Sequence, residues 1–452
     1  MRFFLLLLLT ICLTSCQKES QVDPKIILSG KVEPGEAGFL RLETSARFKY
    51  HNQPELKLDL QVQKDGSFRD TIEIKEGHYI LQTGNNEVNL YLKPGDDLQL
   101  KLNNGNISYD GEGAKENTYI KERDSLIAVV GGNNFYQYFS KLPEEEFLQY
   151  ANSLEEQRLE VINRHGEMDL HLQKTERLWA NVEKAHKFYN YSFTRETVET
   201  SYVASKEYPD PLAELDLNDE DLLHVGLFPM LIYSHFGNIA SDNGMEEWEY
   251  IVKDSFPITN SEIREVAFYT TAVFSMKSFE KLDEFYQKSQ EFIQDKKLKE
   301  VITKQYLALK ELSPGKPAPN FTLRNMKDEP VSLIDFKGNF VYLDFWASWC
   351  KPCIEEIPAF KKLQKKYKND KIFFVSIGIE SNKESIQRLI EKHELNGIHL
   401  FDPSKEKELK DAYSVSGIPH YVLIDKLGSI IESFAMKPSD PQLYNQIDNL
   451  LE

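Results

Sequence analysis

The chain has 452 residues, of which 41% are hydrophobic, and its formal net charge at pH 7 is −18. A chain of this length can bury the cores of two or three domains. The acidic balance argues against binding to nucleic acid and against adhesion to an anionic membrane surface through basic patches.

The N-terminal residues carry the pattern of a secretory signal peptide. Arg2 precedes an apolar run over residues 3–9 that is too short to span a bilayer, and small polar residues lead to Cys16. The sequence Leu-Thr-Ser-Cys at 13–16 resembles the bacterial lipobox, in which cleavage before the cysteine is coupled to lipid attachment on it. We expect residues 1–15 to be removed and the lipid on Cys16 to hold the protein at a membrane. The polar residues 16–24 would form a tether.

A β-rich module is predicted for residues 25–112. Alternating apolar and polar residues over 56–62 end at Lys-Asp-Gly, which is typical of a hairpin turn, and the alternation returns at 88–92 and 98–102. Short strands with one apolar face predict a small antiparallel sandwich or barrel, an all-β sandwich-like module. It contains no catalytic constellation.

Residues 113–312 are predicted to be an all-α region. Pro143 stands where a helix would begin, and the residues beyond it form an apolar stripe: Phe147, Tyr150, Leu154, Leu159 and Ile162. Residues 278–312 predict one or two further amphipathic helices. The histidines of this region show no metal-ligand spacing, and its aromatic residues are expected to pack in the core rather than to line a partner groove.

Three prolines and a glycine within residues 313–319 mark an extended connection and a domain boundary. Strands and helices then alternate: a buried strand over 340–346, a helix over 354–367, a strand over 372–377 and a helix ending near 390. A hairpin over 421–434 and a helix over 441–451 complete the chain. This order predicts an α/β domain over residues 313–452.

The predicted strand over 340–346 runs into Trp349-Cys350-Lys351-Pro352-Cys353. Cysteines separated by two residues at a strand-to-helix junction are typical of a redox-active dithiol, in which one thiolate attacks a disulfide and the other thiol resolves the mixed disulfide. Zinc would need further ligands at suitable spacing, and a structural disulfide across so short a loop would remove little entropy from the unfolded chain. We predict no metal or nucleotide cofactor.

Several motifs together resemble those of the membrane-anchored TlpA/ResA-like thiol-disulfide oxidoreductases. They are Gly315-Lys316-Pro317-Ala318-Pro319-Asn320-Phe321, Asp344-Phe345-Trp346-Ala347-Ser348-Trp349 before the dithiol, Glu356 and Pro358 after it, and Gly417-Ile418-Pro419. The resemblance covers residues 313–452 and implies a thioredoxin-like fold. The β module more weakly resembles one of unknown function that precedes such domains in lipoproteins.

The residues themselves suggest a division of roles within the dithiol. In the thioredoxin-like layout Cys350 lies at a helix N-terminus, where backbone N–H groups and the helix dipole stabilise a thiolate, so it is the expected attacking cysteine. Cys353, one turn further and expected to be more buried, would resolve the mixed disulfide. Lys351 adds a positive charge that should lower the thiol pKa.

The resemblance also assigns roles to residues outside the dithiol. Asp344 corresponds to the buried aspartate that assists proton transfer at the resolving cysteine, and burial in its apolar strand should raise its pKa. Glu356 corresponds to an acidic residue that tunes thiol acidity, although a solvated surface charge is an alternative. Pro419 matches a cis-proline facing the dithiol, so that the backbone of Ile418 could pair with an extended substrate. Trp349 is expected to offer an exposed apolar wall.

We therefore predict a lipid-anchored enzyme of the cell envelope that faces the periplasm and reduces disulfides of other envelope proteins. The direction rests on the resemblance, since Lys351 alone favours a more oxidising couple. Electrons would come from a membrane-embedded thiol donor, and the resemblance associates such proteins with redox homeostasis and cytochrome complex assembly. The alternatives are a binding or assembly lipoprotein with an accessory redox domain and a thiol peroxidase. Against the peroxidase, Ala347 and Leu343 replace the threonine and proline of peroxidase motifs.

Overall fold

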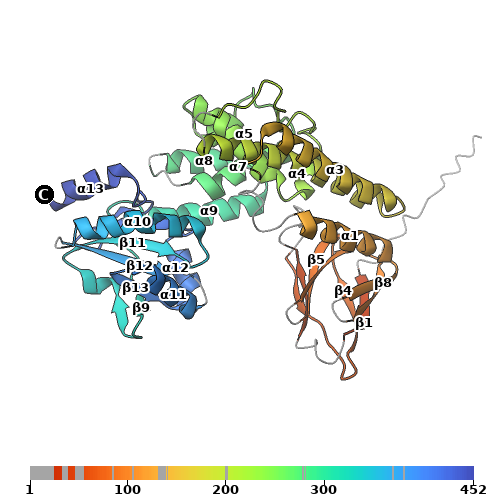
Figure 1. Cartoon of the computed structure of the whole chain (residues 1–452), viewed down its shortest axis with the longest axis horizontal. Helices are drawn as coiled ribbons and strands as arrows, with labels where there is room; N and C mark the ends of the chain where they lie inside the picture. The colour runs from red at the N-terminus through yellow and green to blue at the C-terminus, as the bar shows by residue number, and fades with distance from the viewer. Residues whose placement is uncertain are drawn as a thin grey trace, which may run out of the picture. The chain divides into compact units, whose positions relative to one another are not determined.

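The structure is a computed structural model that describes residues 25–32, 39–45, 55–83, 86–103, 106–130, 139, 141–198, 202–276, 279, 281–368, 371–379 and 382–452. Over these residues the chain divides into two compact units, Met1–His235 and Phe236–Glu452 (Figure 1). The predicted signal peptide, the tether and Cys16 lie outside the described residues. In the described ranges, no helix has both the length and the apolar character needed to cross a membrane.

The first unit begins with a β-sandwich. Its strands are β1 (Lys25–Lys31), β2 (Leu40–Thr44), β3 (Lys57–Asp59), β4 (Ser67–Glu73), β5 (Gly77–Thr83), β6 (Asn86–Leu92), β7 (Asp97–Asn103) and β8 (Asn106–Gly111). Within the described part they form two sheets, ordered β4-β1-β7-β8 and β3-β2-β5-β6. The predicted sandwich is thus confirmed. It is not purely antiparallel, because β1 pairs with β7 in parallel.

Alternating side chains of the sandwich form its core. Leu98 and Leu100 of β7 and Leu90 and Leu92 of β6 are fully buried and pack in one apolar cluster. The Lys64-Asp65-Gly66 turn leads into β4 as predicted, and Gly66 has a positive φ of 82°. A Cβ at this position would come within 2.1 Å of the Val32 carbonyl oxygen, so only glycine fits there.

Helices follow the sandwich in the first unit, namely α1 (Ala114–Val130), α3 (Glu144–Arg164), α4 (Leu170–Val198) and the short 3₁₀ helix η1 (Glu220–His224). Helix α3 begins directly after Pro143, as expected, and Phe147 and Ile162 of the predicted stripe are buried. Helix α5 (Phe228–Asp242) spans the division between the units.

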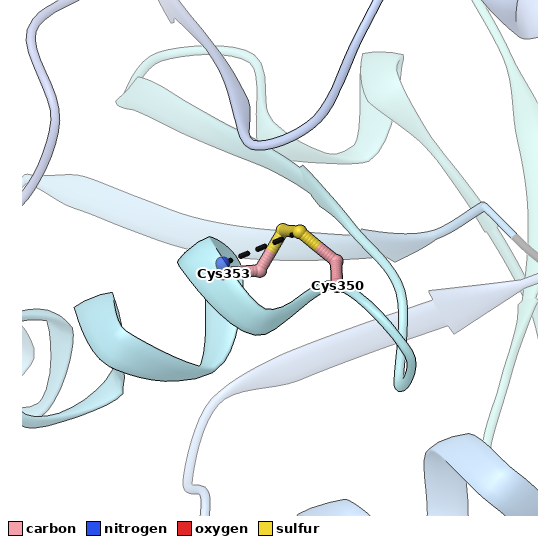
Figure 2. The surroundings of a disulfide bond; sticks show 2 residues. All are labelled: Cys350 and Cys353. Carbon is pink, nitrogen blue, oxygen red and sulfur yellow. Dashed lines mark hydrogen bonds between the residues drawn. A yellow bond between two sulfur atoms is a disulfide. The ribbon is translucent and has the colours of Figure 1, made fainter. Parts of the chain in front are cut away.

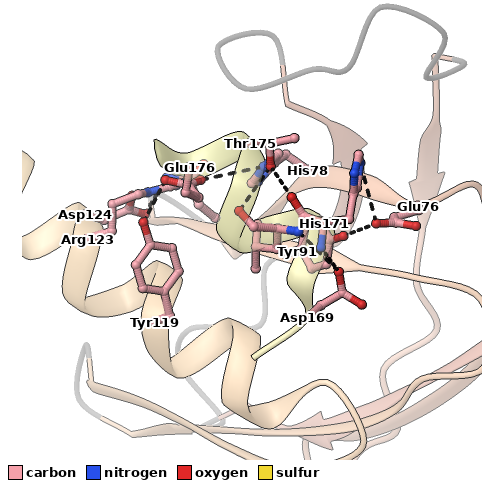
Figure 3. Close-up of polar contacts among 12 residues, drawn as sticks. Glu76, His78, Tyr91, Tyr119, Arg123, Asp124, Asp169, His171, Thr175 and Glu176 are labelled. Carbon is pink, nitrogen blue, oxygen red and sulfur yellow. Dashed lines mark hydrogen bonds and ion pairs between the residues drawn. The ribbon is translucent and has the colours of Figure 1, made fainter. Parts of the chain in front are cut away.

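A buried group of charges connects these helices. Glu176 of α4 is fully buried and pairs with Arg123 of α1 at 2.6 Å and with Arg158 of α3 at 3.1 Å. The hydroxyl of Tyr119 donates to the same carboxylate at 2.7 Å (Figure 3). The arginines lower the pKa of Glu176 to about 2 against the opposing effect of burial. His78 of β5 lies 3.9 Å from this carboxylate, so the sandwich also borders the charge group.

The second unit contains α6 (Glu247–Ile251), α7 (Ser261–Ser275), α8 (Leu282–Phe292) and α9 (Lys296–Glu311), followed by the α/β region. Helices α8 and α9 agree with the one or two amphipathic helices expected over residues 278–312. The α/β elements are β9 (Thr322–Asn325), β10 (Pro330–Ser332), η2 (Leu333–Phe336), β11 (Phe340–Trp346), α10 (Lys351–Lys366), β12 (Ile372–Gly378), α11 (Lys383–His393), β13 (Ile398–Phe401), η3 (Pro403–Lys405), α12 (Glu406–Ala412), β14 (His420–Ile424), β15 (Ile430–Glu432) and α13 (Pro441–Leu451).

The described strands of this region form a seven-stranded sheet ordered β10-β9-β13-β12-β11-β14-β15. Strand β11 lies in the interior of the sheet, parallel to β12 and antiparallel to β14. Successive side chains of β11 pack on opposite faces of the sheet. Tyr342 joins a cluster that contains residues of α10 and α13, while Leu343 joins one that contains residues of α12. The layered thioredoxin-like arrangement predicted from the sequence is confirmed (Figure 1).

The helices before the α/β region continue into its core. Leu312, directly after α9, is buried in the cluster beneath the sheet, and its carbonyl accepts a hydrogen bond from the buried Ser433 hydroxyl at 2.9 Å. The ring of Phe279 lies 6.1 Å from that of Phe434. The boundary predicted at residue 313 stays a prediction, since the compact unit itself begins at Phe236.

Candidate functional site

The two cysteines form a disulfide at the start of α10. Cys350 is the N-cap residue of the helix, and its sulfur accepts a hydrogen bond from the backbone N–H of Cys353 at 3.2 Å (Figure 2). The Cα atoms of the two residues are 5.3 Å apart. Pro352 lies in the first turn, where its missing N–H costs no helical hydrogen bond. Cys350 therefore lies at the positive end of the helix dipole, as expected.

Both cysteines are buried in this disulfide form. Cys350 is 3% exposed and Cys353 is 6% exposed. The expectation that Cys353 is the more buried of the two is therefore wrong here, because Cys350 also packs in the buried cluster of Cys353, Trp346 and Ala347.

Two tryptophans next to the disulfide differ in exposure, and Trp349 is the exposed one, as the sequence predicted. Trp349 is 69% exposed directly before the disulfide, whereas Trp346 is buried beside it. Lys351 projects into solvent and lies 3.7 Å from Glu355 of the same helix, and both side chains are exposed. An apolar surface and a positive charge therefore flank the dithiol on its solvent side.

Pro419 lies in the loop before β14, and its peptide bond with Ile418 is cis, as the resemblance implied. Ile418 is partly buried against the cluster that contains Cys350 and Cys353. The structure thus brings this loop to the dithiol. His420 packs against the rings of Phe345 and Phe434.

Asp344 lies in β11, an interior strand of the sheet, so the alternative of an aspartate on an edge strand is wrong. Ser376, its register partner in β12, donates its hydroxyl to the carboxylate at 3.2 Å. Burial, opposed by the Ser376 hydrogen bond and assisted by the charge of Glu356, raises the pKa of Asp344 to about 7. Strand alternation places Asp344 on the same face as Tyr342, which packs beneath α10. This carboxyl can therefore exchange a proton near neutral pH.

Glu356 lies one turn beyond Cys353 in α10, on the same side of the helix. The backbone N–H and the hydroxyl of Ser439 donate to its two carboxylate oxygens at 2.9 and 2.8 Å, and Lys437 lies 3.7 Å away. Only 14% of the Glu356 side chain is exposed. The Glu356 carboxylate is therefore fixed by hydrogen bonds from Ser439 and is not a solvated surface charge. Sequence reasoning missed Ser439 and Ser376, because no local pattern connects them to the dithiol.

Comparison with known proteins agrees with this geometry. The family model "Redoxin" matches residues 313–447. Over 129 residues the chain is 32% identical to the thiol-disulfide oxidoreductase ResA of Bacillus thuringiensis subsp. konkukian, covering 28% of this chain and 73% of that protein. The chain belongs to the ResA/TlpA-like thiol-disulfide oxidoreductases. It is also 29% identical over 136 residues to ResA of Bacillus cereus, covering 30% of this chain and 78% of that one.

Solved structures match the same part of the chain. The crystal structure of a "putative thiol-disulfide oxidoreductase" from Bacteroides vulgatus is 33% identical in sequence, with a TM-score of 0.30, and the match covers 31% of this chain and 99% of that one. The ResA/TlpA-like relatives are enzymes, and the C-terminal region of this chain is a thiol-disulfide oxidoreductase. Among the residues that the structure describes, no three or more histidine, cysteine, aspartate or glutamate side chains are grouped so as to hold a metal ion.

Proposed function

We propose that this protein is a lipid-anchored thiol-disulfide oxidoreductase of the cell envelope, which reduces disulfides of other envelope proteins through Cys350 and Cys353. The observation that carries the redox part is the Cys350–Cys353 disulfide at the N-terminus of α10, packed with Ile418 of the cis-proline loop. Anchoring through the lipid on Cys16, a periplasm-facing location and a membrane-embedded thiol donor are proposed from the sequence alone.

Reduction of a substrate would proceed in two exchanges. The Cys350 thiolate attacks one sulfur of the substrate disulfide, whose S–S bond breaks, and the other substrate sulfur leaves as a thiolate that takes up a proton. Cys353 then loses its proton and attacks Cys350, which forms the intramolecular disulfide and releases the second substrate thiol. Two electrons pass from the dithiol to the substrate, and the membrane donor returns them.

The neighbours of the dithiol fit these steps. The helix N-terminus stabilises the Cys350 thiolate. Asp344, with a pKa of about 7, can accept the proton of the resolving thiol. Because Trp349 is exposed and the Ile418–Pro419 loop borders the disulfide, an extended substrate segment could lie between them and pair with the backbone of Ile418. Binding of this kind would depend on the backbone of the substrate more than on its sequence.

Trapping of the mixed disulfide tests the proposed roles. Reduced protein carrying Cys353→Ser should accumulate a covalent complex with a disulfide-bonded substrate protein, because its Cys350 can attack but nothing resolves the product. Cys350→Ser should form no such complex at neutral pH. Complexes are counted by non-reducing electrophoresis. Equal trapping by the two variants would contradict the assignment of Cys350 as the attacking cysteine.

A further inference from the structure

The loop after β15 reaches back over the dithiol helix. Ser439 donates its backbone N–H and its hydroxyl to the two oxygens of Glu356, and these residues lie 83 positions apart in the chain. Lys437 of the same loop lies 3.7 Å from that carboxylate. The loop is itself held, since the hydroxyl of Tyr342 donates to the Met436 carbonyl at 2.7 Å. The position of the Glu356 carboxylate is therefore fixed by this loop as well as by α10.

The charge of Glu356 acts on the carboxyl that accepts the proton. Glu356 raises the pKa of Asp344, in addition to the larger effect of burial, and the Ser376 hydroxyl opposes both. The phenols that face this region from β11 and β14, Tyr342 and Tyr421, stay neutral because burial raises the pKa of each.

The remaining charged groups lie on other elements. Lys437 is on the Glu356 side, and Glu432 of β15 acts on Tyr342. His420 of β14 packs against Phe345, whose side chain lies on the opposite face of β11 from Tyr342. A change in the loop would therefore alter the pKa of Asp344 through the charge of Glu356.

We propose that Ser439 is a positioning residue of the dithiol site, which holds the carboxylate of Glu356 near Cys353 and Asp344 and so sets the pH at which the resolving step becomes fast. This rests on the proposed function, because it concerns the second exchange, in which Cys353 gives up its proton and attacks Cys350. Without the hydroxyl, the Glu356 carboxylate can turn towards solvent, its charge acts less on Asp344, and Asp344 ionises at lower pH.

The resolving step can be followed with 5,5′-dithiobis(2-nitrobenzoate). Attack by Cys350 breaks the reagent disulfide and releases one nitrothiobenzoate, and attack by Cys353 on the mixed disulfide releases a second one and forms the Cys350–Cys353 bond. The full chain with Cys12→Ser and Cys16→Ser has no other thiols, since the sequence contains four cysteines. The rate of the second release is measured from pH 4 to pH 9 by stopped flow in detergent.

Ser439→Ala should move the acid limb of this pH profile to lower pH by about half a unit, which is about a threefold faster second release at a pH on that limb. Ser439→Thr, which keeps a hydroxyl, should restore the parent profile. The control is Ser404→Ala, because the backbone N–H and hydroxyl of Ser404 also donate to a carboxylate, here to one oxygen of Asp402 in the turn before α12. Its profile should match that of the parent.

The outcomes separate the two proposals. Identical profiles for the parent, Ser439→Ala and Ser404→Ala, or a shift of Ser439→Ala to higher pH, would overturn the role of Ser439 while the dithiol chemistry stands. A parent protein that releases no second nitrothiobenzoate at any pH would overturn the proposed function and this inference together. Because Ser439 is exposed, the unfolding midpoints of the variants should coincide with that of the parent.

Discussion

At the scale of single residues, Asp344 combines a cost in stability with the proton transfer that we propose for it. Its pKa of about 7 in the folded protein lies above its ordinary value of 3.8 because the carboxyl is buried. The folded state therefore binds more protons than the unfolded state between these values, and stability falls as the pH rises through 7. This loss of stability is expected at a site where a proton must move at neutral pH, because such a site needs a carboxyl with a pKa near 7.

Asp344→Asn should therefore stabilise the protein at pH 8 by up to about 4 kcal/mol and change its stability little at pH 3.5. The same substitution should slow disulfide exchange, because the amide cannot accept the Cys353 proton. Denaturant unfolding of the oxidised protein at the two pH values, with exchange rates measured alongside, checks both parts. A stability gain that is equal at the two pH values would show that burial of the charge is not its cause.

What the sequence could predict at this scale follows from how local each signal is. The Cys350-x-x-Cys353 spacing, the exposed Trp349 and the cis-Pro419 belong to short motifs, and the structure places them together. Ser376 and Ser439 contact the site from 32 and 83 residues away in the chain. A single serine carries no pattern that would identify such a partner, so only the folded arrangement shows its role.

At the scale of elements, the buried charges between α1, α3 and α4 show the limit of periodicity arguments. The apolar stripe correctly predicted that Phe147 and Ile162 of α3 are buried. It did not predict that Arg158 is buried as well, with 4% of the residue exposed. Its charge is tolerated because Glu176 of α4 meets it at 3.1 Å. The parallel pairing of β1 with β7 was missed for a related reason, since alternation predicts a strand's buried face but not its neighbour.

Glu176→Gln should destabilise the first unit by about 3–5 kcal/mol, because Arg123 and Arg158 would stay buried with part of their countercharge removed. The control is Glu167→Gln, whose ion pair with Lys115 is exposed to solvent, so its loss should change the stability little. Thermal unfolding followed by circular dichroism compares the two variants. Similar melting temperatures for both would mean that the buried charge group does not stabilise this unit.

At the scale of the whole molecule, the compact unit containing the dithiol starts at Phe236, well before the motif-rich region. Leu312 lies in the core beneath the α/β sheet, and Ser433 donates to its carbonyl. Proline and glycine at 313–319 predicted an extended connection, but its first residues form a turn, in which the Lys316 N–H donates to the Ser313 carbonyl at 3.0 Å. They could not predict that the residue just before it is buried, because that depends on packing with distant strands.

A fragment of residues 236–452 should therefore be more stable than a fragment of residues 313–452 by about 3 kcal/mol, the combined effect of burying Leu312 and satisfying the Ser433 hydroxyl. Denaturant unfolding of the two fragments gives the difference. Equal stabilities would mean that the preceding helices add nothing to the α/β fold, and that the boundary at residue 313 is also the boundary of the folding unit.

The reduction potential of the Cys350/Cys353 pair tests the central claim most directly. Equilibration of the chain with redox buffers should show a reversible two-electron couple, and for a reductase its potential should lie near the thioredoxin value of about −270 mV. A potential approaching about −120 mV would instead make the protein an oxidant. A pair that does not cycle between dithiol and disulfide at any potential would contradict the account.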